Sequence, residues 1–415
     1  MTDREDEAKT LDRADVRVRH DDSLMGALRE FGERLRSGDL GMLPVIIGLV
    51  LISVVFSVLN PVFLAPNNLV NLLFDCATVG VISLGIVCVL MLGEIDLSVG
   101  SMSGLASAMI GVFWVNAGVS LPLAILAALL VGAVIGAVYA LLFNRLGMPS
   151  FISTLSGLLA ILGLQLYILG PTGSINLPFA SPLVGFGQLW ILPAWLSYLL
   201  GLLPGAVMVW VGLSVMRQRR AAGLSAQPLG RLVLKAASLT LGLEFALWYL
   251  HLGRGVPVMF ALFLALAVVL NYGLTRTQWG RSMFAVGGNR EAARRSGINV
   301  RKIYLSAFVL CSTLAALGGV LSAARLASSS QQAGTGDVNL NAIAAAVIGG
   351  TSLFGGRGSA WSAVLGIIVI QAISNGLTLL NLSSSLRYMI TGGVLAIAVI
   401  VDSLARQSRV SHGRG

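Results

Sequence analysis

Charged side chains are scarce in this sequence of 415 residues: Asp, Glu, Lys and Arg together make up 11% of it, against 56% hydrophobic residues. Soluble globular domains carry roughly 25% charged residues. The composition therefore excludes an ordinary soluble protein. Cysteine is also rare, and Cys76, Cys88 and Cys311 each lie within an apolar segment with no pair spacing. They are interpreted as small core residues, and no disulfide is predicted.

Histidine and lysine are nearly absent, and this excludes most enzymatic sites. Histidine occurs only as His20, His251 and His412, too few for a metal cluster or a Cys/His nucleophile pair. No lysine stands in the pattern Gly-x-x-x-x-Gly-Lys-Ser/Thr, which holds nucleotide phosphates. We therefore expect the chain to be no enzyme, to bind no metal or other cofactor, and to hydrolyse no ATP itself.

Long apolar runs occupy most of the sequence. A helix of about 20 apolar residues crosses the hydrocarbon core of a bilayer, so the predicted fold class is all-α, a polytopic transmembrane protein with about 10–12 spans. One candidate, 340–354, is short and polar enough to be re-entrant. The candidate spans are 43–59, 69–92, 97–116, 122–143, 149–169, 189–215, 232–252, 257–275, 303–324, 340–354, 360–380 and 386–403.

Basic residues gather on one side of these spans. If the N-terminus is cytoplasmic, only Arg254, Arg325 and Arg387 of the 28 Lys and Arg residues face outward. This positive-inside bias predicts a multi-pass protein with both termini in the cytoplasm. The predicted organisation is a polar tail over 1–41, with a short amphipathic helix at 23–36 and no signal peptide, a transmembrane domain over 42–404, and a second tail over 405–415.

Two short motifs resemble one another: Gly-Glu-Ile-Asp-Leu-Ser at 93–98 and Gly-Asp-Val-Asn-Leu-Asn at 336–341. Each follows one apolar helix and precedes others, but the predicted topology puts them at opposite ends of those helices. This predicts two inverted four-helix repeats, about 69–170 and 303–403, an arrangement common among transporters. Central helices over 189–275 and a cytoplasmic loop over 276–302 would separate them.

The polar residues of the two motifs are candidates for a translocation path or a helix break. Acids within apolar sequence mark functional sites by default, because their burial is costly. Such acids also cap and brace a broken helix, and the sequence leaves both interpretations open. Glu244, alone in another apolar run, is expected to face protein or to approach the outer interface near His251. The candidates are Glu94, Asp96, Ser98, Asp337, Asn339 and Asn341.

A charged, alanine-rich stretch bounded by glycines interrupts the apolar sequence between 275 and 303. Its composition indicates a short helix inside a cytoplasmic loop, which is where a soluble partner is able to grip a membrane protein. We predict a docking surface there and no catalytic site. Its residues are Gly287, Gly288, Asn289, Glu291, Ala292, Ala293, Arg294, Arg295, Ser296 and Gly297.

Three stretches together resemble the membrane permeases of ATP-binding-cassette sugar importers of the ribose, xylose and galactoside kind. They are 93–101, the cytoplasmic stretch 277–298, and 344–358 with its Gly-Gly-Arg-Gly run. The long central region looks similar to that of xylose-type permeases. The resemblance extends over about residues 70–403 but leaves out the N-terminal tail and the central helices.

The resemblance implies a second permease subunit, in a homodimer or pseudo-dimer, two cytoplasmic ATPase subunits that bind ATP and Mg, and a periplasmic sugar-binding protein. The docking stretch would then be the coupling helix of an importer in the bacterial inner membrane that moves D-xylose or another pentose by alternating access. Two alternatives stay open: the permease of a branched-chain amino-acid importer, and an ion-coupled secondary carrier in which Glu94 or Asp96 binds a proton or sodium ion.

Overall fold

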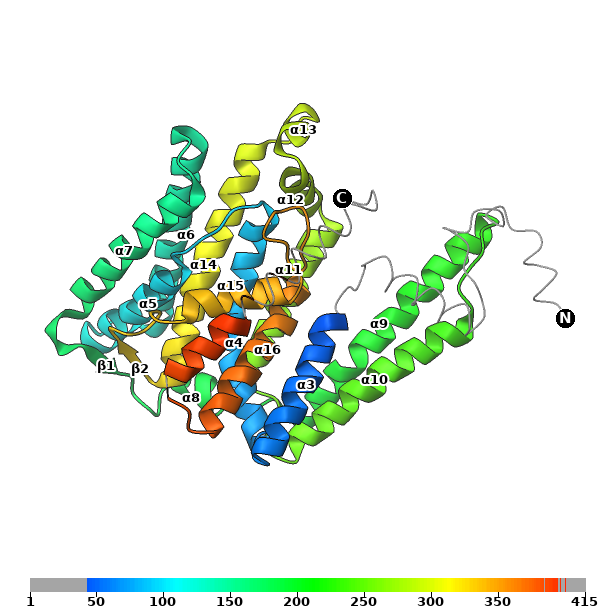
Figure 1. Ribbon diagram of the computed structural model, residues 1–415, viewed down its shortest axis with the longest axis horizontal. Coiled ribbons are helices and arrows are strands. Elements are labelled where there is room, and N and C mark those ends of the chain that lie inside the picture. The colour runs from blue at the N-terminus through cyan, green and yellow to red at the C-terminus, as the bar shows by residue number, and fades with distance from the viewer. Residues whose placement is uncertain (1–42, 384, 395, 397–399, 401–415) are drawn as a thin grey trace. The chain divides into compact units, whose positions relative to one another are not determined.

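The protein is helical throughout most of its length in a computed structural model, which describes residues 43–383, 385–394, 396 and 400 (Figure 1). The predictions for the two tails and for the last part of span 386–403 lie outside these residues. The elements are α3 (Leu43–Leu59), α4 (Pro66–Met91), α5 (Val99–Met109), the π-helix η1 (Ile110–Asn116), α6 (Leu121–Leu146), α7 (Ser150–Leu169), the 3-10 helix η2 (Gly170–Thr172), β1 (Ser174–Asn176), α8 (Pro182–Gln188), α9 (Ala194–Ala221), α10 (Leu229–His251), α11 (Val258–Arg276), α12 (Gln278–Gly288), α13 (Arg290–Arg295), α14 (Val300–Leu326), β2 (Ser328–Ser330), α15 (Val338–Ile348) and α16 (Ala360–Leu379).

Nine helices of the described residues are long and apolar enough to cross a membrane, which confirms the predicted all-α polytopic fold. The candidate span 340–354 corresponds to α15, which has only 11 residues. At 1.5 Å per residue such a helix covers about half of a hydrocarbon core of about 30 Å. It therefore does not span, in line with the re-entrant interpretation. The inverted symmetry of the two repeats stays a prediction.

The chain divides into two compact units. One contains residues 192–256, which form the helical hairpin of α9 and α10, and the other contains 41–191 and 257–404. The predicted central region 189–275 is thus divided, because α11 packs against α4 and α16 of the second unit. Within the hairpin the carboxyl of Glu244 lies against α9, since a Cβ on Gly201 would be 2.7 Å from its Oε1. The expectation that Glu244 faces protein is confirmed.

The core of the larger unit lies around α14, which packs against α4, α5 and α6. About three quarters of the most apolar part of α4, of α5 with η1, and of α14 is buried, at 78%, 72% and 72%, against 11% for α9 and for α10. Small residues bring these helices close, as they do in membranes, where close packing substitutes for a hydrophobic driving force. At Gly319 of α14 a Cβ would be only 2.0 Å from the carbonyl oxygen of Ser103 in α5.

The two ends of the larger unit differ in what they carry. The short helices α12 and α13 lie at one end, and the two-stranded sheet of β1 and β2 lies with α8 at the other (Figure 1). In that sheet Ser174 pairs with Ser330 and Asn176 with Ser328 in antiparallel register. The chain enters α14 directly after α13 and leaves it directly before β2, so α14 connects the two ends.

The tight contact at Gly319 gives a first prediction. Gly319→Ala forces a methyl group against the backbone of α5 and should lower the free energy of unfolding by about 1–3 kcal/mol, as overpacking does. Gly163→Ala in α7 is the matched control, because nothing lies within 4 Å of its Cβ. The measurement is the folded fraction of detergent-solubilised protein after heating. Equal thermal stability of the two variants would contradict the packing described here.

Candidate functional site

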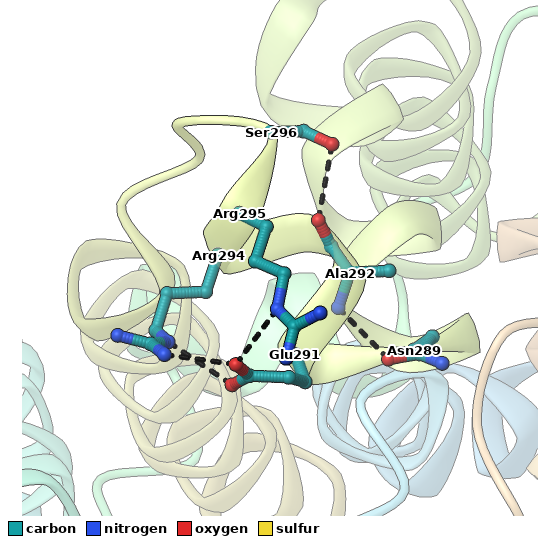
Figure 2. Close-up of polar contacts among 6 residues, drawn as sticks. All are labelled: Asn289, Glu291, Ala292, Arg294, Arg295 and Ser296. Carbon is teal, nitrogen blue, oxygen red and sulfur yellow. Dashed lines mark hydrogen bonds and ion pairs between the residues drawn. The ribbon is translucent and has the colours of Figure 1, made fainter.

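The predicted docking stretch forms the six-residue helix α13, whose two ends are closed by local hydrogen bonds (Figure 2). At its start the side chain of Asn289 accepts a hydrogen bond of 2.9 Å from the N–H of Ala292, which is an N-cap. At its end Gly297 adopts a left-handed φ of 83°. The N–H groups of Gly297 and Ile298 then donate to the carbonyls of Arg294 and Ala293, which is a Schellman motif. A helix too short to be stable alone is thus fixed in length.

The exposed face of α13 carries a charge cluster of Glu291, Arg294 and Arg295. The carboxylate of Glu291 accepts from Nη2 of Arg294 at 2.8 Å and from Nε of Arg295 at 3.2 Å (Figure 2). Hydrogen bonds from Arg294 hold the pKa of Glu291 below its usual range. Exposed ion pairs contribute little to stability, so the cluster mainly presents two ordered guanidinium groups to solvent. Ala293 is buried on the opposite side.

The glycines before α13 take part in a backbone junction of three remote segments. Met91 ends α4, and its carbonyl oxygen accepts a 2.9 Å hydrogen bond from the N–H of Gly356. Gly287 near the end of α12 lies so close that a Cβ there would be 1.8 Å from the same oxygen. A Cβ on Gly355 would be 2.7 Å from the oxygen of Gly287 and 3.0 Å from the nitrogen of Gly93, so the three stretches that carry the family resemblance meet at one point. The backbone of Gly288 lies beside Gly356, but a Cβ on Gly288 would point into open space, with nothing within 4 Å.

The first predicted motif forms the irregular connection between α4 and α5. Asp96 is fully buried, and its Oδ1 accepts from the N–H and the hydroxyl of Ser98 at 2.8 and 2.7 Å. This is an Asx turn that braces the chain immediately before α5. Burial raises the pKa of the Asp96 carboxyl, and its Oδ2 has no hydrogen-bond partner among the described residues.

Glu94 has different surroundings from Asp96, although only one residue separates them. Its carboxylate accepts a 2.5 Å hydrogen bond from the hydroxyl of Ser150 at the start of α7. Burial raises the pKa of Glu94, and the Ser150 hydrogen bond opposes this rise. The two acids thus do not form one site: Asp96 braces the turn, and Glu94 binds a neighbouring helix.

The second motif completes the start of α5. The N–H of Gly100, in the first turn of α5, donates to the side-chain oxygen of Asn339. Such N–H groups have no partner inside their own helix, so this cap comes from a segment more than 200 residues away. The preceding chain comes equally close, since a Cβ on Gly100 would be 2.5 Å from the oxygen of Gly334. The two motifs therefore meet, although the helices before them end at opposite ends of the unit.

The other polar residues of the second motif pair with each other. The amide of Asn341 donates to the carboxylate of Asp337 at 2.9 Å, one turn apart at the start of α15. The side-chain oxygen of Asn341 is left without a partner among the described residues. Unpaired buried acceptors of this kind are suited to hydroxyl groups or water.

Sequence reasoning missed Gln165, a polar residue in the apolar helix α7. It is fully buried, and its amide nitrogen donates to the carbonyls of Ser330, Gln331 and Ala333 at 3.2, 3.3 and 3.0 Å. It thereby holds the non-helical segment between β2 and α15 against α7. A lone amide in an otherwise apolar run was the only available signal. In the part of the chain that the structure describes, no three His, Cys, Asp or Glu side chains gather as a metal site.

Comparison with known proteins places these features in a family. Residues 68–399 match the family described as branched-chain amino acid transport system / permease component. The chain is 36% identical over 346 residues to the xylose transport system permease protein XylH of Escherichia coli K12, covering 83% of this chain and 87% of the relative. It is 34% identical to XylH of Haemophilus influenzae over 381 residues, 89% of this chain and 98% of the relative.

A relative named for another pentose is similar over most of the same length. The ribose import permease protein RbsC of Escherichia coli K12 is 33% identical over 356 residues, which is 86% of this chain and 91% of the relative. No solved structure matches the chain.

The backbone junction gives a second prediction, with adjacent residues as test and control. Gly287→Ala places a methyl group on the carbonyl of Met91 and should lower thermal stability by the equivalent of about 1–3 kcal/mol. Gly288→Ala, with open space around its Cβ, should keep wild-type stability. Thermal unfolding of both purified variants is the measurement. A Gly288→Ala variant as unstable as Gly287→Ala would argue against the junction.

Proposed function

The chain belongs to the permease family of ATP-binding-cassette importers, and from this premise we propose that it carries a monosaccharide, D-xylose or another pentose, across the bacterial inner membrane. It is a multi-pass membrane protein and a permease subunit, so ATP hydrolysis belongs to a separate subunit. The similarity to XylH over 83% of the chain is the observation that carries the proposal. The relatives named for xylose and ribose both support a pentose.

The amino-acid alternative is not favoured. The family description mentions branched-chain amino acids, but the relatives similar along most of the chain are named for sugars. The polar groups around the two motifs suit a neutral solute as well, because amides and hydroxyls hydrogen-bond a polyol without a counter-charge. We propose that Asp337, Asn339 and Asn341 lie along this path, and that Asp96 and Ser98 brace it.

We propose that α13 is the coupling helix, seated in a cytoplasmic ATPase subunit that holds the ATP and Mg of the transporter. Its exposed guanidinium groups, its fixed length and the contact of the preceding Gly287 with Met91 and the 355–356 loop support this role. The cytoplasmic position of α13 follows from the positive-inside bias, and this orientation puts both termini in the cytoplasm. The remaining partners are a second copy of this chain and a periplasmic sugar-binding protein.

Reversing the charge of the coupling helix tests its docking role. Arg294→Glu sets a second acid beside Glu291, and Gly297→Pro is incompatible with the left-handed φ at that position. Both variants should still insert into the membrane but lose the ATPase on co-purification, and uptake of labelled pentose should fall to background. Arg145→Glu makes an equal change of charge at an exposed position in α6. This variant should keep both the co-purifying ATPase and the uptake of labelled pentose. Normal uptake in both test variants would refute docking through α13.

Replacing Asp96 distinguishes this importer from an ion-coupled carrier. In Asp96→Asn the amide oxygen still accepts from Ser98, so uptake should persist and an ionophore should not abolish it. Asp96→Ala removes the brace and should lower the yield of folded protein, with a loss of about 1–3 kcal/mol for the unpaired polar groups left behind. A folded Asp96→Asn variant that transports nothing, together with ionophore-sensitive wild-type uptake, would instead favour ion coupling.

A further inference from the structure

Arg290, the first residue of α13, was not among the predicted docking residues, and it differs from its neighbours in what it contacts. Its guanidinium lies over the rings of Phe143 in α6 and Tyr304 in α14, at 5.2 and 5.3 Å from the ring centroids. The two rings pack together with centroids 4.5 Å apart. A guanidinium over aromatic faces is held by cation–π attraction. One side chain thus fastens α13 to two membrane helices.

The same group acts on Glu94 in the connection between α4 and α5. The positive charge of Arg290 favours the ionised carboxylate, and the hydroxyl of Tyr304 interacts with it as well. Both oppose the rise in the pKa of Glu94 that burial causes. Glu94 is also bound to α7 through Ser150. Arg290 is thus in contact with Tyr304, and both interact electrostatically with Glu94, which links the docking helix to the segment before α5.

The connection between α4 and α5 is also contacted by the residues that precede Asn289. Gly287 touches the carbonyl of Met91, at the end of α4, and Arg290 acts on Glu94 three residues further along. Beyond Glu94 the chain is stiff, since the Asx turn of Asp96 leads directly into α5. A displacement of α13 therefore has two routes into residues 91–94, one through backbone contact and one through a side chain.

We propose that Arg290 is a positioning residue which, through Tyr304 and Glu94, transmits movement of the coupling helix to the start of α5. The inference rests on the proposed function, because the movement comes from the partner ATPase. It separates two tasks on one short helix. Arg294 and Arg295 face the partner, and Arg290 faces the membrane helices. Loss of Arg290 should uncouple transport from ATP hydrolysis without releasing the ATPase.

A double-mutant cycle in the assembled transporter tests this link. Arg290→Gln, Glu94→Gln and the double variant are reconstituted in proteoliposomes with the ATPase and the binding protein, and uptake of labelled D-xylose and D-ribose is measured per ATP hydrolysed. Each single variant should keep its ATPase subunits but transport about tenfold less per ATP. The double variant should be no worse than either single one, because both changes break the same link. A merely structural defect would lower the amount of active transporter and leave this ratio unchanged.

Arg145→Gln is the matched control, an exposed arginine in the same last turn of α6 as Phe143, and it should leave the ratio unchanged. A normal ratio in Arg290→Gln, losses that multiply in the double variant, or release of the ATPase from Arg290→Gln would each overturn the link. If Arg290→Gln does not fold, the cycle is run with Arg290→Lys, which keeps the charge but stacks less well, and multiplied losses again overturn the link.

The same experiment separates the link from the function on which it rests. Wild-type proteoliposomes that take up neither pentose with ATP would overturn the proposed function, and the link with it. Wild-type uptake with normal ratios in both single variants would overturn the link alone.

Discussion

The end of the larger unit that carries α12 and α13 depends on one group, the carbonyl oxygen of Met91. It belongs to the last turn of α4, where a helix leaves its carbonyls without partners, and it is satisfied by the N–H of Gly356 from a loop near the other end of the chain. Gly287 closes over it because it has no side chain. One carbonyl group with no partner in its own helix thereby joins the end of α4, the segment before α13 and the 355–356 loop, and a methyl group placed between them would force them apart.

A similar dependence governs the start of α5, the buried helix that follows. Its free N–H at Gly100 is capped by Asn339, and the turn before it is braced by Asp96. The connection between α4 and α5 is thus held at both ends by backbone groups that have no partner within their own helix. This places the polar atoms of the two motifs together, and the short stretch 91–100 connects them to the segment before α13. The proposed solute path and the proposed docking surface are consequently parts of one connected structure.

Much of this arrangement is readable from the sequence, because it depends on local rules. Apolar runs indicated the helices, the charged stretch bounded by glycines indicated the short helix α13, and the shortness of 340–354 indicated a helix that does not span. The convergence of three glycine-rich stretches was not predictable, since close backbone approach depends on tertiary packing. Nor was the inward placement of Arg290 predictable, because a six-residue helix has too few turns for periodicity to tell an inward from an outward arginine. Gln165 was missed because an isolated amide carries no pattern.

The chain passes into the hairpin of α9 and α10 and returns from it at a single place. The N–H of Leu192 donates to the carbonyl of Val256 at 2.8 Å, and Ile191 forms an isolated bridge with Pro257. A segment whose two ends already lie side by side is added to or removed from a fold with little loss of chain entropy, since the flanking residues keep their positions. The hairpin therefore has the geometry of an insertion, able to vary in length and sequence while the helices of the larger unit keep theirs.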